Sequence, residues 1–526
     1  MTKPSYSNPK FNLWSETWIN LERSSGPPVL VSIEQALLEA HCFIAICNPS
    51  PLVVVGIHRL LVAIMQASLD PQKEADLRRV WQNGCFPVES IKAFGEIYSN
   101  RFDLFSTEMP FLQSGDLPLC PEKGDNSKTV AYLAAETSPA SALDHYRHPF
   151  TSGEYFCPTC AASTLLTIPP FVSIGGRGYR PSINGIPPLY VLPVGNNLFQ
   201  SLILSLLWPK ETYWPNAASR QNDWPWWKHS PTIERGKEVI EVGYLHSLTF
   251  PARQIRLHPV KKNSLCTRCG QVSEWGVSTM IFEMGESRPK DSSPWMDPFV
   301  AYRLPDEGKT GNPFAIRPDS NKALWREFSG LFLSPGRDAK KRVQRPSILS
   351  HIAEQEYGED QPEIHFRCIG VRMDQAKVLE WVDASFKVPA KVMNDIDVTY
   401  KVKQATQFAD DCGGVMAGAF RSAVNTSRLG DRHKRLKDQM LRQYWATLAN
   451  PFRYFILSLV EPENRSMAIE QWANTVARQA QAAFNANITQ IGEDAASLRQ
   501  QTQGMQDCHS KLEKKVKKYL EQGVII

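Results

Sequence analysis

Two Cys-x-x-Cys pairs carry the clearest chemistry in this sequence. They are Cys157 with Cys160 and Cys266 with Cys269, and 105 residues separate the two pairs. Zinc prefers four soft ligands in a tetrahedron, and each pair presents two sulfurs to one metal. The spacing therefore predicts one structural Zn²⁺, because a site closed by four thiolates leaves no position open for a substrate. Four reduced thiols in a core, or one redox-active pair, are the alternatives.

The long separation means that elements from two distant parts of the chain must position these thiols. A compact zinc ribbon places its second pair about 15 to 20 residues after the first, so here the metal would join segments that are remote in sequence. The residues between the pairs are rich in Pro, Gly and Trp. We expect short strands and helices on an irregular scaffold there, with one buried, Asn-capped helix over residues 196–208.

Composition and cysteine usage exclude several classes of protein. The 526 residues carry a net charge of +5, and 11 cysteines in this length are typical of a reducing compartment and not of a disulfide framework. The first residues lack the apolar core of a secretory signal. The most apolar stretch, residues 41–65, is interrupted by Asn, Pro, His and Arg. We therefore expect a cytoplasmic protein with no membrane span.

The chain changes character near residue 395. Residues 401–526 contain 18 Lys and Arg against 12 Asp and Glu, a net charge of +6, and their apolar residues recur every three or four positions, as in amphipathic helices. We predict an α+β fold. It consists of a large irregular mixed domain over residues 1–395, which contains the zinc site, and a four-helix bundle over residues 396–526.

Local signals near the amino terminus predict where its first elements lie. Ser32 and Gln35 have the spacing of a capping box and predict that a helix begins after Ser32. Trp14 and Trp18, in an extended entry segment, are expected to anchor the core.

No catalytic constellation is recognisable, which indicates that the protein is not an enzyme. The sequence contains neither a P-loop nor an H-E-x-x-H motif. Glu89 and Lys92 are one residue too far apart for the Glu-x-Lys of a metal-dependent nuclease. His145 and His148 precede the first cysteine pair, as in a His-Asn-His nuclease, but no matching Asn and His follow the second pair.

Two kinds of segment are suited to a phosphate backbone. Gly175, Gly176 and Gly178 have no Cβ to keep a ligand away, and Arg177 and Arg180 add positive charge beside them. A solvent-exposed turn is the alternative. Residues 428–437 and 511–518 place cations at helical spacing, which suits nucleic acid but is also typical of a solvated helix face.

Several motifs together resemble one family, the large subunit (CasA) of the type I-E CRISPR Cascade complex. Residues 11–19, FNLWSETWI, are similar to its opening motif. Residues 101–105, RFDLF, followed by PFLQ at 110–113, resemble its most specific signature. Residues 370–376, GVRMDQA, resemble a later motif. With the cysteine pairs and the terminal helices, the resemblance spans nearly the whole chain.

The resemblance implies a non-catalytic subunit in antiviral defence. Such a subunit recognises the protospacer-adjacent motif (PAM) of double-stranded DNA from the minor groove and wedges the strands apart so that an R-loop begins. The wedge falls on Gln375. The family's minor-groove lysine corresponds by counting to Met284, and Arg288 or Lys290 is the expected substitute. With the basic cluster near residue 430, the expected DNA-binding residues are Ser173, Ile174, Gly175, Gly176, Arg177, Gly178, Arg288, Lys290, Arg372, Gln375, Arg432, Lys434, Arg435 and Lys437.

The resemblance also implies the partners. They are the backbone, small and crRNA-end subunits of Cascade, the crRNA, PAM-containing duplex DNA and a helicase-nuclease. Contact with the crRNA end and its neighbouring subunit is expected from His145, Tyr146 and Arg147. Two other classes stay open, namely a zinc-dependent nuclease, which would cleave nucleic acid by itself, and a scaffold protein indifferent to the PAM.

Overall fold

The computed structural model divides the chain into two compact units, each described here by itself. Unit 1 comprises Met1–Pro318, Val343–Tyr357 and Ile364–Lys387, and unit 2 comprises Asp319–Arg342, Gly358–Glu363 and Val388–Ile526. The residues that the structure describes are 9–119, 127–134, 153–172, 179–180, 182–209, 223–230, 232–289, 295–305, 311–319, 323–334, 343–354, 363–374, 377–424 and 431–523.

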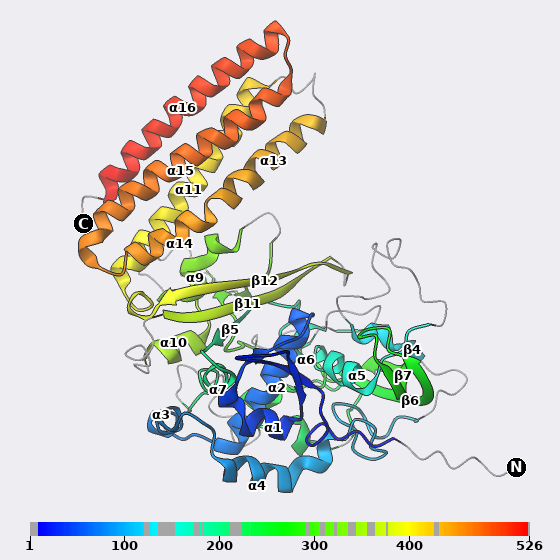
Figure 1. The fold of residues 1–526 in the computed structure, drawn as a ribbon. Coiled ribbons are helices and arrows are strands. Elements are labelled where there is room, and N and C mark those ends of the chain that lie inside the picture. Colours follow the sequence, from blue (N-terminus) through cyan, green and yellow to red (C-terminus); the bar gives the residue numbers. More distant parts are fainter. Residues whose placement is uncertain are drawn as a thin grey trace, which may run out of the picture. The chain divides into compact units, whose positions relative to one another are not determined.

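Unit 1 is a mixed α+β structure whose strands form small sheets (Figure 1). The described strands form four three-stranded sheets, in the orders β2-β1-β3, β4-β7-β6, β12-β11-β5 and β10-β8-β9. The first contains β1 Ile19–Arg23, β2 Val29–Val31 and β3 Phe43–Ile46, and the second contains β4 Ser127–Thr129, β6 Arg253–Leu265 and β7 Val272–Met284. The third contains β5 Tyr190–Val194, β11 Glu363–Asp374 and β12 Lys377–Pro389, and the fourth contains β8 Tyr302–Arg303, β9 Phe314–Ala315 and β10 Val343–Gln344.

Several helices of unit 1 pack against one buried helix, α2, Pro51–Leu69. By length and composition α2 could cross a membrane, contrary to the expectation from residues 41–65, but 83 % of its most apolar window is buried inside the protein. The other α-helices described in this unit are α1 Ile33–Leu38, α3 Glu74–Asn83, α4 Val88–Tyr98, α5 Pro158–Leu165, α6 Ile168–Phe171, α7 Leu198–Ile203, α8 Tyr244–Leu248 and α10 Ser347–Glu354.

The amino-terminal sequence signals have the predicted local effects. The Ser32 side chain caps α1 by accepting a hydrogen bond from the Gln35 N–H at 3.1 Å. Trp14 and Trp18 are buried, and the Trp18 indole donates to the Leu13 carbonyl at 2.9 Å. The predicted helix over residues 196–208 is shorter than expected, since α7 begins after its cap, Asn197, and ends at Ile203.

Gly56 allows α2 to approach the end of α5 closely, and this close approach gives a stability prediction. A Cβ at Gly56 would lie 2.6 Å from the backbone oxygen of Leu166. Gly56→Ala is therefore expected to lower the free energy of unfolding by about 1–3 kcal/mol through overpacking. Urea unfolding measures the change. Gly418→Ala, at an open helical position in unit 2, is the control and is expected to stabilise by about 0.5–1 kcal/mol, and equal effects of the two variants would contradict the close approach.

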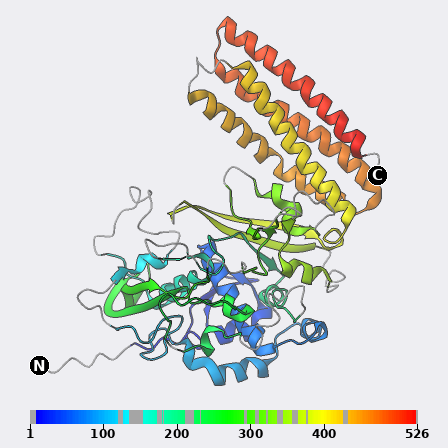
Figure 2. The ribbon, with the colours of Figure 1, turned by 180° about the vertical axis from the view of Figure 1, so that it is seen from behind.

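Unit 2 is helical in its carboxy-terminal part. Figures 1 and 2 show α11, α15 and α16 running alongside one another, and α13 packs against α15. The described α-helices are α9 Phe328–Phe332, α11 Ile396–Ala423, α13 Asp431–Thr447, α14 Ala449–Ser458, α15 Arg465–Ile488 and α16 Ala495–Gly523. Only Leu448 separates α13 from α14. A division of the chain into domains at residue 395 stays a prediction.

Aromatic contacts and ion pairs join the helices of unit 2. Trp325, from the segment before α9, lies 4.7 Å from Phe452 and 6.0 Å from Trp472 between ring centroids. Arg465 at the start of α15 binds the carboxylates of Asp395 and Asp397 at 2.6 Å each. The beginnings of α11 and α15 are therefore fixed to each other.

Candidate metal centre and nucleic-acid interface

The two cysteine pairs lie on different elements of unit 1. Cys157 is the N-terminal cap of α5, and Cys160 lies within the first turn of this helix. Cys266 and Cys269 lie in the turn that joins the long antiparallel strands β6 and β7. Among the described residues these four are the one group found with metal-binding proximity, and their sulfurs all lie within 4.8 Å of one another.

Backbone pairing brings the two cysteine pairs together. Phe156 exchanges two hydrogen bonds with Val277 of β7, at 2.9 and 2.8 Å, and the Thr267 N–H donates to the Tyr155 carbonyl at 2.8 Å. Gly276 permits this approach, because a Cβ there would lie 2.5 Å from the Phe156 oxygen. The segment before α5 is thereby held against the β6–β7 turn, and each cysteine pair faces the other.

The spacing of the sulfurs suits a tetrahedral metal ion. The Cys157 and Cys269 sulfurs are 3.7 Å apart, close to the edge of about 3.8 Å in a tetrahedron with zinc–sulfur bonds of about 2.3 Å. Hydrogen bonds from the Cys157 and Cys160 thiols hold the pKa of Cys266 far below its usual value. Hydrogen bonds with the Cys157 and Cys266 sulfurs, followed by burial, hold the pKa of Cys160 far above its usual value. A bound metal ion would displace the thiol protons, because the metal binds the thiolate form.

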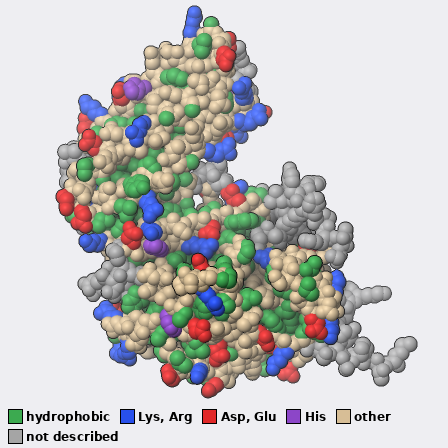
Figure 3. All heavy atoms as spheres, in the orientation of Figure 1, with side chains coloured by type: hydrophobic (Ala, Val, Ile, Leu, Met, Phe, Trp, Pro, Cys, Tyr) green, Lys and Arg blue, Asp and Glu red, His purple; other side chains and the backbone are tan. Residues whose placement is uncertain are grey.

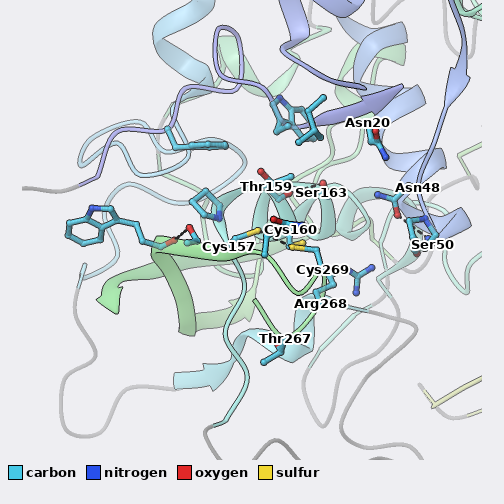
Figure 4. Close-up of a pocket in the computed structure, with 18 of the residues that line it drawn as sticks. Asn20, Asn48, Ser50, Cys157, Thr159, Cys160, Ser163, Thr267, Arg268 and Cys269 are labelled. Carbon is cyan, nitrogen blue, oxygen red and sulfur yellow. Dashed lines mark hydrogen bonds between the residues drawn. The ribbon is translucent and has the colours of Figure 1, made fainter. Parts of the chain in front are cut away.

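A cavity of about 990 Å³ lies beside the cluster. Figure 4 shows Cys157, Cys160 and Cys269 close together within it, with Asn20, Asn48 and Ser50 contributed from other elements. Cys269 is exposed whereas the other three cysteines are buried. The four sulfurs could hold one metal ion and, once they did, would leave no coordination position for a substrate.

Most of the expected DNA and crRNA contacts lie outside the described residues. This applies to the glycine-rich segment 173–178, to Lys290, to Gln375 and to the expected crRNA contacts His145, Tyr146 and Arg147. Their flanks are described. Gln375 falls between β11, which ends at Asp374, and β12, which begins at Lys377, and these are neighbouring strands of one sheet. Their roles stay predictions.

The described cations near these segments are engaged within the protein. Arg288 is half-buried, its Nη2 donates to the Ile240 carbonyl at 3.2 Å, and burial lowers its pKa. Arg372 on β11 forms an ion pair with Glu380 at 2.9 Å. Arg180 forms an ion pair with Glu238 and donates to the Ser287 hydroxyl at 3.3 Å. Binding DNA through these side chains would require such contacts to be exchanged or shared.

The basic cluster of unit 2 lies on α13. Arg432, Lys434 and Arg435 are exposed and Lys437 is half-buried. Arg432 donates to the Gln490 carbonyl at 2.9 Å, whereas Lys434 and Arg435 make no ion pair within the described part of the chain. Figure 3 shows Lys and Arg side chains along the α13 edge of unit 2, with acidic side chains between and beside them. These cations are accessible to a phosphate backbone.

Sequence reasoning did not single out three residues whose contacts lie beside the segments expected to bind DNA. Glu238 is paired with Arg180 across 58 positions, and Asn184 is bonded to Asp297 across 113 positions. The only local signal among them is Asn184-Gly185, which indicates a turn. Pairing at such separations has no signature in a single sequence.

Similarity to known proteins identifies the protein family. A family model described as CRISPR-associated protein Cse1 matches residues 12–483. The curated protein CasA/Cse1 of Thermus thermophilus is 27 % identical over 524 residues, which cover 95 % of this chain and 96 % of that protein.

Solved structures share the fold. Thermus thermophilus CasA is similar with a TM-score of 0.76 and 25 % identity, covering 96 % of this chain and 100 % of that one. Cse1 from Acidimicrobium ferrooxidans gives a TM-score of 0.79 at 19 % identity, over 97 % and 99 % of the two chains. A chain of a CRISPR RNA-guided surveillance complex gives 0.73 at 19 % identity, over 96 % and 100 %.

The architecture is thus that of a CRISPR-associated protein with a mixed α+β unit and a helical carboxy-terminal region. The chain belongs to the Cse1 (CasA) family, whose model matches nearly its whole length. The resemblance read from its sequence motifs is confirmed.

Proposed function

We propose that this protein is the large, non-catalytic subunit of a crRNA-guided type I-E Cascade complex. In this role it recognises the PAM in double-stranded DNA from the minor groove and opens the duplex to start an R-loop. The observation that carries the proposal is the Cse1 family match over residues 12–483. Support comes from the similar chain of an RNA-guided surveillance complex, which has the same fold.

The proposed partners follow from this role. They are the backbone, small and crRNA-end Cascade subunits, the crRNA, the target duplex and a helicase-nuclease, in the cytoplasm. The four cysteines would hold a structural Zn²⁺, since soft thiolates in a four-sulfur set suit zinc. The carboxy-terminal helices would act as a four-helix bundle that holds displaced DNA and touches the small subunits.

The function is tested by assembling the complex from the neighbouring subunits and crRNA. Binding to duplexes with a randomised PAM is then measured, and selection of a defined PAM is expected only when this chain is present. Equal binding to all duplexes would favour a PAM-indifferent scaffold. Metal-dependent cleavage by the purified chain would favour a nuclease.

The cations of α13 give a prediction about PAM-independent affinity. Neutralising Arg432, Lys434, Arg435 and Lys437 together is expected to weaken binding to all duplexes alike, because fewer counterions are released from phosphate. The magnitude of the slope of log affinity against log salt should fall by about 0.9 for each phosphate that the variant no longer neutralises.

A charge-matched control separates this effect from net charge. It neutralises four exposed cations of unit 1, which are Lys73, Arg78, Arg79 and Lys92, and its salt slope should stay that of the unaltered complex. An unchanged slope in the α13 variant would assign its cations to a solvated helix face.

A further inference from the structure

The flanks of the two segments expected to read the PAM pack into one hydrophobic cluster. Val172 precedes the glycine-rich segment and Ile183 follows it, while Trp295 follows the segment that contains Arg288 and Lys290. Ile183 and Trp295 are buried together with Val242, Phe250 and Ala252, and Val172 packs against them. The ends of two segments more than 100 residues apart therefore share one anchoring point.

A buried ion pair reinforces this anchor. Arg59 and Asp297 are 2.9 Å apart, with side chains only 1 % and 0 % exposed. The Asn184 amide donates to the same Asp297 oxygen at 3.1 Å and to the Tyr190 hydroxyl at 2.8 Å, and this hydroxyl donates to the Pro170 carbonyl at 3.0 Å. Asn184 thus joins both sides of the glycine-rich segment to the residue that follows the second segment.

A second link lies nearer to the expected contacts. Arg180 pairs with Glu238 and donates to the Ser287 hydroxyl. Ser287 is itself bonded through its backbone to both neighbours of Glu238, at 2.9 and 2.8 Å. The next residue, Arg288, donates to the Ile240 carbonyl. Two residues after the glycine-rich segment, the chain is therefore tied to the residue that precedes Arg288.

We propose that Asn184 and Glu238 are positioning residues that hold the described flanks of the glycine-rich segment and of the Arg288 segment in one register, so that PAM discrimination depends on both links. The inference rests on the proposed function and concerns how that site is organised. Apparent affinity falls in proportion to the fraction of molecules in the binding-competent arrangement. Losing a link lowers this fraction for PAM contacts only, because phosphate contacts elsewhere do not depend on the register.

Asn184→Ala removes the first link, and Glu238→Gln removes the ion pair of the second link, both with little risk to folding. In Asn184→Ala, Asp297 keeps Arg59 and the Phe299 N–H, which it accepts at 3.0 Å. In Glu238→Gln, the altered side chain is 46 % exposed, and all cations are kept. The matched controls are Asn12→Ala, which loses a 2.9 Å amide bond to the Ser99 carbonyl, and Glu274→Gln, which loses an exposed ion pair with Lys261.

The experiment uses the assembled complex and measures Kd for a PAM duplex and for the same duplex with a scrambled PAM. Each positioning variant is expected to lower the ratio of the two affinities roughly fivefold to tenfold. Affinity for the scrambled duplex should stay constant. The control variants should keep the ratio of the unaltered complex, and thermal melting checks that all four variants remain folded.

A charge swap separates positioning from direct contact. Arg180→Glu should reduce discrimination, and adding Glu238→Arg should restore it if the ion pair acts through geometry. Failure of the swap to restore the ratio would overturn the role of Glu238 and assign Arg180 to direct DNA contact. If the unaltered complex discriminates and Asn184→Ala does so equally, the positioning inference alone is wrong. If the unaltered complex binds both duplexes equally, the proposed function itself fails.

Discussion

Cys266→Ser combined with Cys269→Ser is expected to leave unit 1 misfolded and free of metal. These two residues supply half of a cluster whose sulfurs lie within 4.8 Å of one another. Structural zinc sites contribute on the order of 10 kcal/mol of metal-linked free energy, which is comparable to the whole stability of a typical protein, about 5–15 kcal/mol. Metal analysis of the purified protein should find one equivalent of zinc, and circular dichroism should show the loss of structure in the variant.

Cysteines outside the cluster provide the control. Cys42→Ser with Cys85→Ser alters an exposed and a half-buried thiol and should keep the zinc and the unfolding transition. Zinc content far below one equivalent in the unaltered protein, or normal folding of the double variant, would refute the structural site. A chelator should reproduce the effect of the variant, because binding energy is folding energy in such sites.

Gln375→Ala is expected to leave the assembled complex bound to PAM duplex while slowing R-loop formation. A glutamine at the wedge would occupy stacking space and bond exposed base edges, and unstacking a base step costs a few kcal/mol. A mismatched bubble beside the PAM should therefore restore the rate. Gln72→Ala, at an exposed position of unit 1, is the control and should behave like the unaltered complex.

Gly176→Asp should distinguish recognition of the PAM from opening of the DNA duplex. A side chain and a negative charge in a segment expected to approach the groove closely should abolish PAM-dependent binding. The bubble should not restore it, because the lost step precedes opening. If both variants lose binding equally and the bubble restores neither, Gln375 is an ordinary surface residue and the division of roles is wrong.

Local chemistry was predictable from the sequence. A serine three residues before an amide residue predicted the start of α1, because the cap depends only on neighbouring backbone groups. The cysteine spacing predicted which four thiols lie together, because two Cys-x-x-Cys pairs are typical of one four-sulfur metal site. The family motifs predicted the protein family, because each motif is a short run of neighbouring residues that can be recognised without the fold.

Features that depend on distant partners were not predictable. Polar interruptions in residues 41–65 argued against an apolar span, yet His58 and Arg59 are buried within α2, where His58 is hydrogen-bonded to Ser205 and Arg59 forms an ion pair with Asp297. Arg180 was expected to offer its charge to phosphate, and the structure pairs it with Glu238. In both cases the compensating group comes from another part of the chain. A single sequence does not show which distant residues will pair.

The separation of the two cysteine pairs has a consequence for synthesis. Cys160 leaves the ribosome 106 residues before Cys266, and translation at about 5–20 residues per second makes this interval roughly 5–20 seconds. Throughout this interval the first pair would be half of the proposed ligand set, and β7, which pairs with the segment before α5, is also still missing. We therefore expect the nascent chain to depend on cellular reductants to keep Cys157 and Cys160 as thiols until Cys266 and Cys269 emerge.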